Sequence, residues 1–243
     1  MKLINKKILI TGVTSGIGLA LVEKLYQSND IYIIARNKQK IKELQSRFPD
    51  VIAYQADFSN IAALQGVVNE ISHEIHSLDL LINNAAVQYT PMFTDNDFDV
   101  NSIIDEITTN FTSICYLCYL LLPVLNQQHS AVILNVNSGL AIAPKTTSAI
   151  YCATKVALSS FSKSLRYQLN NTQVQVLQAF LPLVDTPMTK GRGSAKMSVD
   201  NVSSEIIKGI EKTIIDHDIG KVKLLRIINR LLPSLAQKIM RNN

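Results

Sequence analysis

The chain has few cysteines, three among its 243 residues. An odd number at this density does not form a disulfide framework, so the sequence predicts a reducing, cytoplasmic compartment. Long hydrophobic runs are missing too, since the longest, Ile114 to Leu125, has 12 residues and contains Pro123. A helix that spans a bilayer needs about 20 apolar residues, so we expect this run to form a buried helix. The apolar stretch from Ile8 to Ile10 is too short for a signal peptide, and we expect no export.

Residues that would bind a metal are sparse. The four histidines, at positions 73, 76, 129 and 217, show no ligand spacing, and we expect no metal. Cys115 and Cys118 form a CxxC pair, but a redox pair of this kind begins a helix, and a zinc site needs two further ligands. Because the pair lies within an apolar helical segment, we interpret it as core, and Cys152 as a packing residue.

The overall composition is not extreme in any direction. Hydrophobic residues make up 47% of the chain and charged residues 18%, which excludes disordered and collagen-like proteins. At about 150 residues per domain, the length allows one large domain or two small ones. We find no internal repeat, low-complexity stretch or linker, so one domain spanning residues 1–243 is the simplest interpretation.

Positive charge is concentrated in the C-terminal tail. The formal net charge is +5, and residues 221–243 contain six Lys and Arg with no Asp or Glu, so the rest is nearly neutral. Apolar residues at three- and four-residue spacing predict one amphipathic helix over 221–241, kinked by Pro233. Such a helix fits a membrane surface, or packing on its own domain or a partner subunit, which we favour. No aromatic–basic motif indicates nucleic-acid binding.

Apolar runs of strand length alternate with longer segments of helical period. This alternation predicts an α/β fold, a single Rossmann-type domain with a doubly wound parallel sheet. The expected strands are Lys7–Thr11, Ile31–Ala35, Val51–Gln55, Leu78–Asn83, Ala131–Asn137 and Val174–Phe180. The expected helices are Gly16–Gln27, Lys38–Arg47, Asn60–His76, Asn101–Leu122, Ser148–Leu169 and Val199–Ile215. A Gly-, Lys- and Ser-rich segment at 187–200 is expected to be a mobile substrate loop.

The first expected strand runs into a glycine-rich turn and then a helix. Three of the nine glycines, Gly12, Gly16 and Gly18, lie in this turn. Glycine lets the backbone approach a pyrophosphate, and a helix N-terminus supplies free N–H groups, although a tight turn alone would also need glycine. The strand–turn–helix context favours a dinucleotide site.

The end of the second expected strand indicates which dinucleotide the site binds. An acidic residue there would bind the 2′-hydroxyl of NAD, but the sequence continues Ala35-Arg36-Asn37. An arginine suits the 2′-phosphate of NADP, so we favour NADP(H) over NAD(H). The alternative is that Arg36 is a solvated loop charge.

Tyr151 and Lys155 are four residues apart in a helical segment, which places both on one face. A free tyrosine titrates near pH 10, about three units above neutrality, and a nearby ammonium would bring its pKa closer to the working range. Ser138 follows an expected strand and could donate to a substrate oxygen while Tyr151 transfers the proton.

Together these residues resemble the short-chain dehydrogenase/reductase family. The resemblance rests on TGVTSGIG at 11–18, Asp57, NNAA at 83–86, Asn110, Ser138, YCATK at 151–155 and PLVDT at 182–186. It covers about Lys7 to Met188. The stretches ILNVNSGLA, YCATK and SLRYQL look closest to a bacterial branch described as DltE-like.

The resemblance implies an NAD(P)-dependent oxidoreductase and a role for each matched position. Tyr151 would be the acid/base, Lys155 would lower its pKa and bind the nicotinamide ribose, and Ser138 would orient the substrate oxygen. Asn110 would hold a water that links Lys155 to solvent. The implied cofactor contacts are Gly12, Thr14, Ser15, Gly16, Ile17 and Gly18 around the pyrophosphate and adenosine ribose, Asp57 and Phe58 at the adenine, Asn83 on the ribose side, and Val184 and Thr186 at the carboxamide.

Several positions depart from the family pattern. Ala86 and Leu183 replace glycines beside the cofactor's path, and Ser15 lacks the basic side chain of some NADP-preferring members. The family also implies a homodimer or homotetramer through helices 101–122 and 148–169. An alternative is a dinucleotide-sensing scaffold without turnover, although all four catalytic positions are present. The resemblance implies a small carbonyl or alcohol compound as substrate. Residues 89–100, 141–148 and 187–200 would select it, and the cations of the last segment would either bind an anion or be solvated.

Overall fold

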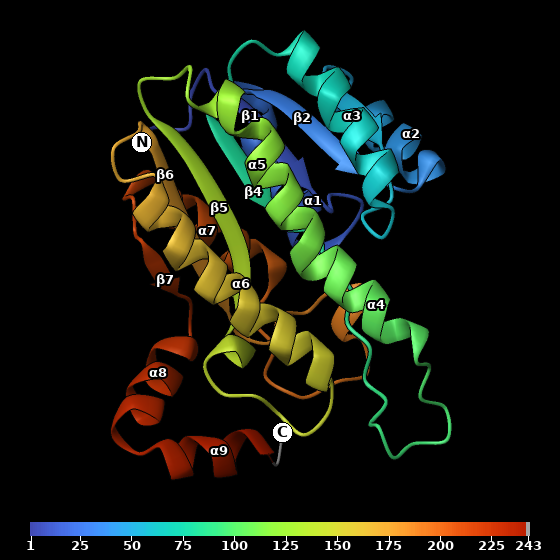
Figure 1. Cartoon of the computed structure of the whole chain (residues 1–243), viewed down its shortest axis with the longest axis vertical. Helices are drawn as coiled ribbons and strands as arrows, with labels where there is room; N and C mark the ends of the chain where they lie inside the picture. The colour runs from blue at the N-terminus through green and yellow to red at the C-terminus, as the bar shows by residue number, and fades with distance from the viewer. Residues whose placement is uncertain (242–243) are drawn as a thin grey trace.

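The protein, described by a computed structural model over residues 1–241, is built on one seven-stranded parallel sheet (Figure 1). The strand order is β3-β2-β1-β4-β5-β6-β7. The strands are β1 (Lys7–Thr11), β2 (Asp30–Ala35), β3 (Ile52–Gln55), β4 (Leu80–Asn83), β5 (Ala131–Ser138), β6 (Val174–Leu181) and β7 (Asp216–Asp218). The predicted doubly wound α/β fold is confirmed.

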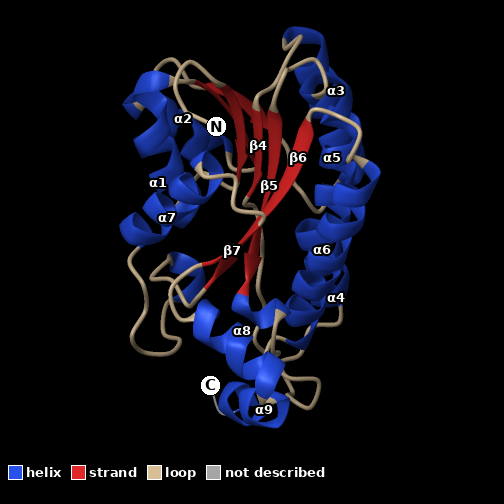
Figure 2. Cartoon of the chain, turned by 90° about the vertical axis from the view of Figure 1, so that its left-hand side faces the viewer, coloured by secondary structure: helices blue, strands red, loops and turns tan. Residues whose placement is uncertain are grey.

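Helices cover both faces of the sheet (Figure 2). One layer contains α1 (Gly16–Leu25), α2 (Lys38–Arg47) and α7 (Val199–Glu211), and the other contains α3 (Ile61–Glu74), α4 (Asn101–Ile107), α5 (Ser113–Leu125) and α6 (Ala149–Gln168). Strand residues alternate between the two resulting cores. Ile8 and Ile10 of β1 belong to the first and Leu9 to the second, as the two-residue period of a strand requires.

The edge strand β7 was not expected from the sequence. We predicted a helix over Val199–Ile215, but α7 ends at Glu211 and β7 follows at Asp216–Asp218. Its three residues pair with β6, and among them His217 alone is buried. A strand so short and polar has no apolar alternation, and this explains why the pattern concealed it.

The long apolar helix of the second layer is interrupted by a π-helical turn, η2 (Thr108–Thr112), between α4 and α5. By length and composition alone, Asn101–Leu125 is apolar enough to cross a membrane. In the fold, however, Ile114, Leu117 and Leu121 pack in the core against the sheet. The buried helix predicted for this run is therefore confirmed, with Pro123 inside its last turn.

The C-terminal segment forms two helices, which corrects the prediction of one kinked helix over 221–241. These are α8 (Val222–Leu231) and α9 (Pro233–Arg241), and Leu232 between them has φ −138° and ψ 65°. Pro233 lacks the N–H that would continue α8, but its fixed φ suits the first position of a new helix. The proline therefore ends one helix and starts another.

The carboxyl ends of the strands meet at one edge of the sheet, where the chain order reverses between β1 and β4. In open parallel sheets, ligands bind in the crevice at such a reversal. The glycine-rich turn after β1 and Ser138 at the end of β5 both lie at this edge.

Candidate active site

The turn after β1 depends on its glycines. Gly12 and Gly16 have φ of +69° and +57°, which favours glycine. A Cβ on Gly18 would lie 2.3 Å from the carbonyl oxygen of Gly12. Ser15, the N-cap of α1, makes no side-chain hydrogen bond to the helix, and this leaves the first N–H groups for an anion. The turn, which also contains Thr14 and Ile17, has the shape and the donors that a pyrophosphate requires.

Thr11 and Asn84 join the two strand ends at the crevice. Thr11 Oγ1 accepts hydrogen bonds from the N–H groups of Asn84 and Ala85, each at 3.0 Å. The Asn84 amide donates to the carbonyl oxygens of Thr11 and Gly12, also at 3.0 Å each. The sequence led us to Asn83 instead, but its side chain is buried and donates to Asn135 Oδ1 at 2.8 Å. Asn83 Oδ1 is buried and has no hydrogen-bond partner within the described residues, and the role of Asn83 on the ribose side of the cofactor stays a prediction.

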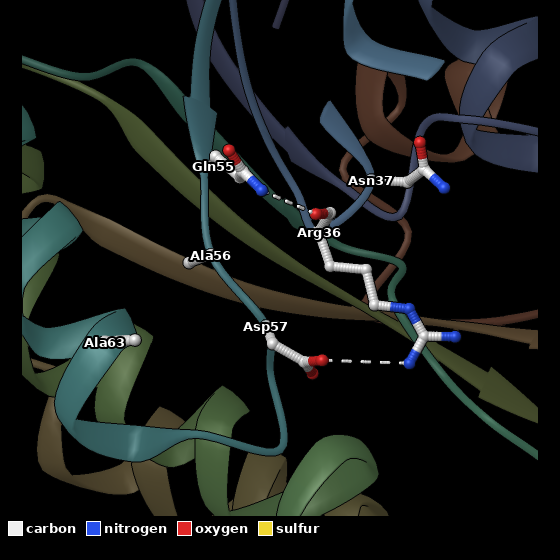
Figure 3. Close-up of a pocket in the computed structure, with 6 residues that line it drawn as sticks. All are labelled: Arg36, Asn37, Gln55, Ala56, Asp57 and Ala63. Atoms are coloured by element: carbon white, nitrogen blue, oxygen red, sulfur yellow. Dashed lines mark hydrogen bonds and ion pairs between the residues drawn. The ribbon is translucent and has the colours of Figure 1, made fainter. Parts of the chain in front are cut away.

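A pocket of about 550 Å³ opens at the carboxyl ends of β2 and β3 (Figure 3). Its lining is Arg36, Asn37, Gln55, Ala56, Asp57 and Ala63. Arg36 Nη1 lies 3.8 Å from Asp57 Oδ2, and the Arg36 side chain is 65% exposed, so this pair is weak. Arg36 therefore remains available to an anionic ligand. The ring of Phe58 packs into the core rather than lining this pocket.

The helix α6 carries Tyr151 and Lys155 one turn apart and places both against the end of β5. Lys155 Nζ donates to the carbonyl oxygen of Val136 at 3.0 Å and lies 5.5 Å from the centroid of the Tyr151 ring. Both side chains are buried. Ser138 ends β5, and its hydroxyl oxygen accepts a hydrogen bond from the Leu140 N–H at 3.1 Å. The structure thus brings Ser138, Tyr151 and Lys155 together at the end of β5.

The surroundings of these residues shift their pKa values in opposite directions. Burial raises the pKa of Tyr151, with further increases from Cys152 and Glu106, while Ser138 lowers it. Burial lowers the pKa of Lys155 to about 8. We expected Lys155 to lower the pKa of Tyr151, but it is not among the groups with the largest effects. That role stays a prediction for the protein with its cofactor.

Asn110 lies in the π turn η2 and is completely buried. Its Oδ1 accepts from the Val87 N–H and its Nδ2 donates to the Val87 carbonyl, both at 2.8 Å. The same amide donates to Thr154 Oγ1 at 3.4 Å. Asn110 therefore connects the segment after β4 with the residue next to Lys155, and its part in a water relay stays a prediction.

Val184 and Thr186 lie across the crevice from the glycine-rich turn. A Cβ on Gly16 would be 3.2 Å from Thr186 Cγ2, although the two residues are far apart in the sequence. Val184 is buried and forms an isolated parallel bridge with Met197. The carboxamide contacts expected here thus adjoin the turn expected to hold the pyrophosphate.

The segment 187–200 is tied to the body of the domain. Arg192 Nη1 donates to Gln88 Oε1 at 2.7 Å, and the Gln88 amide donates to Ser148 Oγ at 3.1 Å. Lys196 Nζ donates to the Thr189 carbonyl at 2.7 Å. Because Arg192 and Lys196 have partners within the chain, the structure gives little support to an anion-binding role for these cations.

Glu106 is a further residue of this edge that sequence reasoning missed. It is 2% exposed, and its carboxylate accepts from the Tyr89 N–H at 2.8 Å. Burial raises its pKa. Glu106 follows Asp105 in a short helix of mixed composition and gave no sequence signal, because its hydrogen-bond partner Tyr89 comes from the segment between β4 and α4.

Cys118 packs in the core, Cys152 is buried outside the two core clusters, and Cys115 is partly buried. Burial raises the pKa of Cys115 to about 11 and that of Cys118 to about 12, so both are poor nucleophiles at neutral pH. Within residues 1–241, no group of three or more His, Cys, Asp or Glu side chains is arranged to hold a metal ion. Leu183, at a family glycine position, lies against Gly193, where a Cβ would be 2.5 Å from its Cδ2.

A parallel α/β sheet with a glycine-rich turn and a Ser–Tyr–Lys cluster at its carboxyl edge defines a dinucleotide-dependent oxidoreductase. The family model for short chain dehydrogenases matches residues 6–197. The chain belongs to the short-chain dehydrogenase/reductase family, and it is an NAD(P)-dependent enzyme that acts on CH–OH and C=O groups.

Individual proteins agree with this assignment. The Bacillus subtilis (strain 168) protein named Uncharacterized oxidoreductase DltE is 35% identical over 207 residues, 84% of this chain and 82% of that protein. The NADP-dependent 3-hydroxy acid dehydrogenase of Schizosaccharomyces pombe is 28% identical over 239 residues, 94% of this chain and 89% of its own. The structure of a short chain dehydrogenase from Burkholderia cenocepacia in complex with NADP has a TM-score of 0.88, 20% identity and 99% coverage of both chains. The predicted family and its DltE-like branch are confirmed.

Proposed function

We propose that the enzyme interconverts a carbonyl and a secondary alcohol with NADP(H), using Tyr151 as the acid/base. The observation that carries the proposal is the meeting of Ser138, Tyr151 and Lys155 at the edge that also holds the glycine-rich turn. A hydroxyl donor, a proton carrier and a buried ammonium are the groups that such a reaction requires.

The preference for NADP(H) rests on the pocket at Arg36. The second strand ends without a carboxylate at this point, and Arg36 has only a weak contact with Asp57 at 3.8 Å. A guanidinium binds a phosphate through paired hydrogen bonds, which the 2′-hydroxyl of NAD does not offer. The Schizosaccharomyces pombe relative, named NADP-dependent, supports the same choice.

In the reduction, the bound nicotinamide would supply the hydride. Ser138 would donate a hydrogen bond to the carbonyl oxygen, and Tyr151 would give its proton to the alkoxide that forms. Burial keeps the Tyr151 hydroxyl protonated at neutral pH, and this is the form that reduction needs. Lys155, fixed by the Val136 carbonyl, would bind the nicotinamide ribose, while Asn110 holds the neighbouring backbone in place.

Calorimetric titration with NADPH and with NADH tests the cofactor preference. We expect NADPH to bind at least tenfold more tightly, a difference of about 1.4 kcal/mol. Replacing Arg36 with Ala should remove this difference, whereas replacing Arg47, an exposed arginine of α2, should leave it unchanged. Equal affinities in the unchanged protein would overturn the preference. Binding without turnover of any carbonyl compound would favour a dinucleotide-sensing scaffold.

We also propose a cytoplasmic homodimer or homotetramer. The outer faces of α4, α5 and α6 expose large apolar side chains, among them Ile104, Tyr119 and Val156 at 66%, 75% and 48%. Exposed apolar side chains on three helices of one layer support contact between subunits. Sedimentation equilibrium measures the assembly directly, and a monomer at micromolar concentration would refute it.

A further inference from the structure

The helices α8 and α9 leave most of their large apolar side chains on the surface. Leu224, Ile227, Leu231, Leu232 and Leu235 are 44–69% exposed, whereas Val222 and Ala236 are buried. In α8 the exposed residues recur at spacings of three and four and so form one stripe. The predicted packing on the protein's own domain therefore involves only the inner side of the pair, which lies beyond the end of the sheet (Figure 2).

The charges beside this stripe have one sign. Residues 221–241 contain six Lys and Arg and no Asp or Glu. Arg226 turns inward, where it pairs with Asp218 at 2.5 Å and covers the Phe180 ring. Lys223 and Arg230 of α8 and Lys238 of α9 are exposed and form no ion pair within the described residues. The surface thus combines an apolar stripe with uncompensated positive charge.

We propose that this α8–α9 face docks onto an anionic lipid surface. Its apolar stripe would enter the boundary between headgroups and acyl chains, and the cations would bind the anionic headgroups. A second copy of this chain fits less well, because a twofold interface would bring two faces with positive charge together, and residues 221–241 of neither copy contain a carboxylate side chain to neutralise it. Charge complementarity therefore favours an anionic lipid surface over a second copy of the chain.

The docked protein would present its substrate side to the lipid. A Cβ on Gly139, next to Ser138, would lie 3.4 Å from Val222 and 3.5 Å from Leu225 of α8. Thr146 Oγ1 donates to the Arg241 carbonyl at 2.7 Å, so α9 is also tied to the segment before α6. The docking itself does not depend on the proposed function.

Sedimentation of the full chain with vesicles tests the proposal. We expect binding to phosphatidylcholine vesicles that contain phosphatidylglycerol, much weaker binding to phosphatidylcholine alone, and a decline as salt increases. Absence of binding, or equal binding to both vesicle types, would overturn the proposal.

Two sets of variants locate the surface. Replacing Lys223, Arg230 and Lys238 together with Gln should reduce binding at least tenfold. The matched control replaces three exposed lysines of α2 with Gln, at positions 38, 40 and 42, and should bind like the unchanged protein. Equal losses in both variants would indicate general charge attraction and refute the assigned surface.

A third variant separates lipid from a second copy. Replacing Leu224, Ile227 and Leu231 with Gln should reduce vesicle binding without changing the melting temperature, because all three are exposed. Its mass in solution should equal that of the unchanged protein. A smaller assembly in this variant would show that the face joins copies of the chain, against the proposal.

Discussion

At the residue scale, the acid/base assignment depends on one hydroxyl group. Replacing Tyr151 with Phe removes that group and retains the ring that lies over Lys155. We expect kcat to fall by about 10²–10⁴-fold, the usual contribution of a positioned proton donor. NADPH affinity measured by calorimetry should change little. Turnover close to that of the unchanged enzyme would exclude Tyr151 as the proton carrier.

The proposed contact of Lys155 with the cofactor should make cofactor binding sensitive to pH. Burial lowers the pKa of Lys155 to about 8, so the side chain becomes neutral above that pH. A neutral Lys155 would attract the oxygen atoms of the nicotinamide ribose less strongly. NADPH affinity should therefore decline as the pH increases through about 8. A Lys155→Arg variant keeps its charge, so its affinity should vary less with pH, whatever its absolute value. Parallel pH profiles for the two proteins would contradict this role.

A substitution at Gly18 tests whether the glycine-rich turn after β1 needs its close backbone packing. A Cβ there would be 2.3 Å from the Gly12 carbonyl, so Gly18→Ala must displace backbone. We expect loss of NADPH binding and a lower free energy of unfolding. Gly66→Ala in α3 is the control, because its Cβ would meet nothing within 4 Å, and it should stabilise the protein by up to about 1 kcal/mol. Similar effects of both substitutions would refute the packing argument.

These residues also show how far the sequence alone could lead. The positions of Ser138, Tyr151 and Lys155 were predictable, because the end of a strand and the period of a helix each determine where a side chain lies. The contacts of Asn83 and Asn84 could not be predicted, because β4 ends between them: the Asn83 amide donates to Asn135 on the neighbouring strand, whereas the Asn84 amide donates to the Thr11 and Gly12 carbonyls of the glycine-rich turn.

At the element scale, the predicted helices and strands were correct where one hydrophobic period dominates the sequence. Strands with continuous apolar runs and helices with apolar stripes were located within a few residues. The edge strand β7 was missed because tertiary contacts hold it rather than its own pattern. Arg166 of α6 reaches it, donating to Asp216 Oδ1 and to the Val176 carbonyl, each at 3.0 Å.

A substitution at Arg166 tests whether tertiary contacts hold β7 in the sheet. Replacing Arg166 with Gln removes the side-chain donor to the Val176 carbonyl and the cationic partner of the partly buried Asp216, whose Oδ1 then keeps only the Gln178 amide at 3.0 Å. We expect the free energy of unfolding, from urea titration, to fall by about 1–3 kcal/mol. The exposed pair of Arg47 with Glu23 is the control, and Arg47→Gln should cost at most about 1 kcal/mol. Equal costs would show that Arg166 contributes nothing specific to β7.

At the scale of the whole molecule, stability should depend on His217. Its side chain is buried, and burial lowers its pKa below the value of about 6.5 expected in the unfolded chain. The folded protein therefore favours the neutral form of His217. The stability that this preference contributes to the fold is complete above about pH 6.5 and is lost as the pH falls below that value.

Urea unfolding at a series of pH values measures this contribution. The unchanged protein should lose stability as the pH falls below about 6.5, and a His217→Gln variant should lose less over the same range. Glu205, 3.5 Å from Nε2, opposes part of the shift, so the difference will be modest. Identical slopes for the two proteins would exclude His217 as the titrating group.

The layered architecture followed from the sequence, whereas the surfaces did not. Alternating periods predicted two helix layers on a parallel sheet, because each element must bury its apolar side. The exposure of α8 and α9 could not be predicted, since an apolar stripe has the same sequence pattern whether it is covered or exposed.

The π turn at Thr108–Thr112 bears on how the chain would tolerate insertions and deletions. Its wider turn holds one residue more than an α-helical turn. Deleting one residue there would convert the π turn into an α-helical turn, so α4 and α5 would keep the faces that they bury. The same deletion within the regular helix α5 would instead rotate its two parts by about 100° and turn core residues such as Leu117 away from the sheet. The chain should thus tolerate the loss of one residue at this turn better than anywhere in α5.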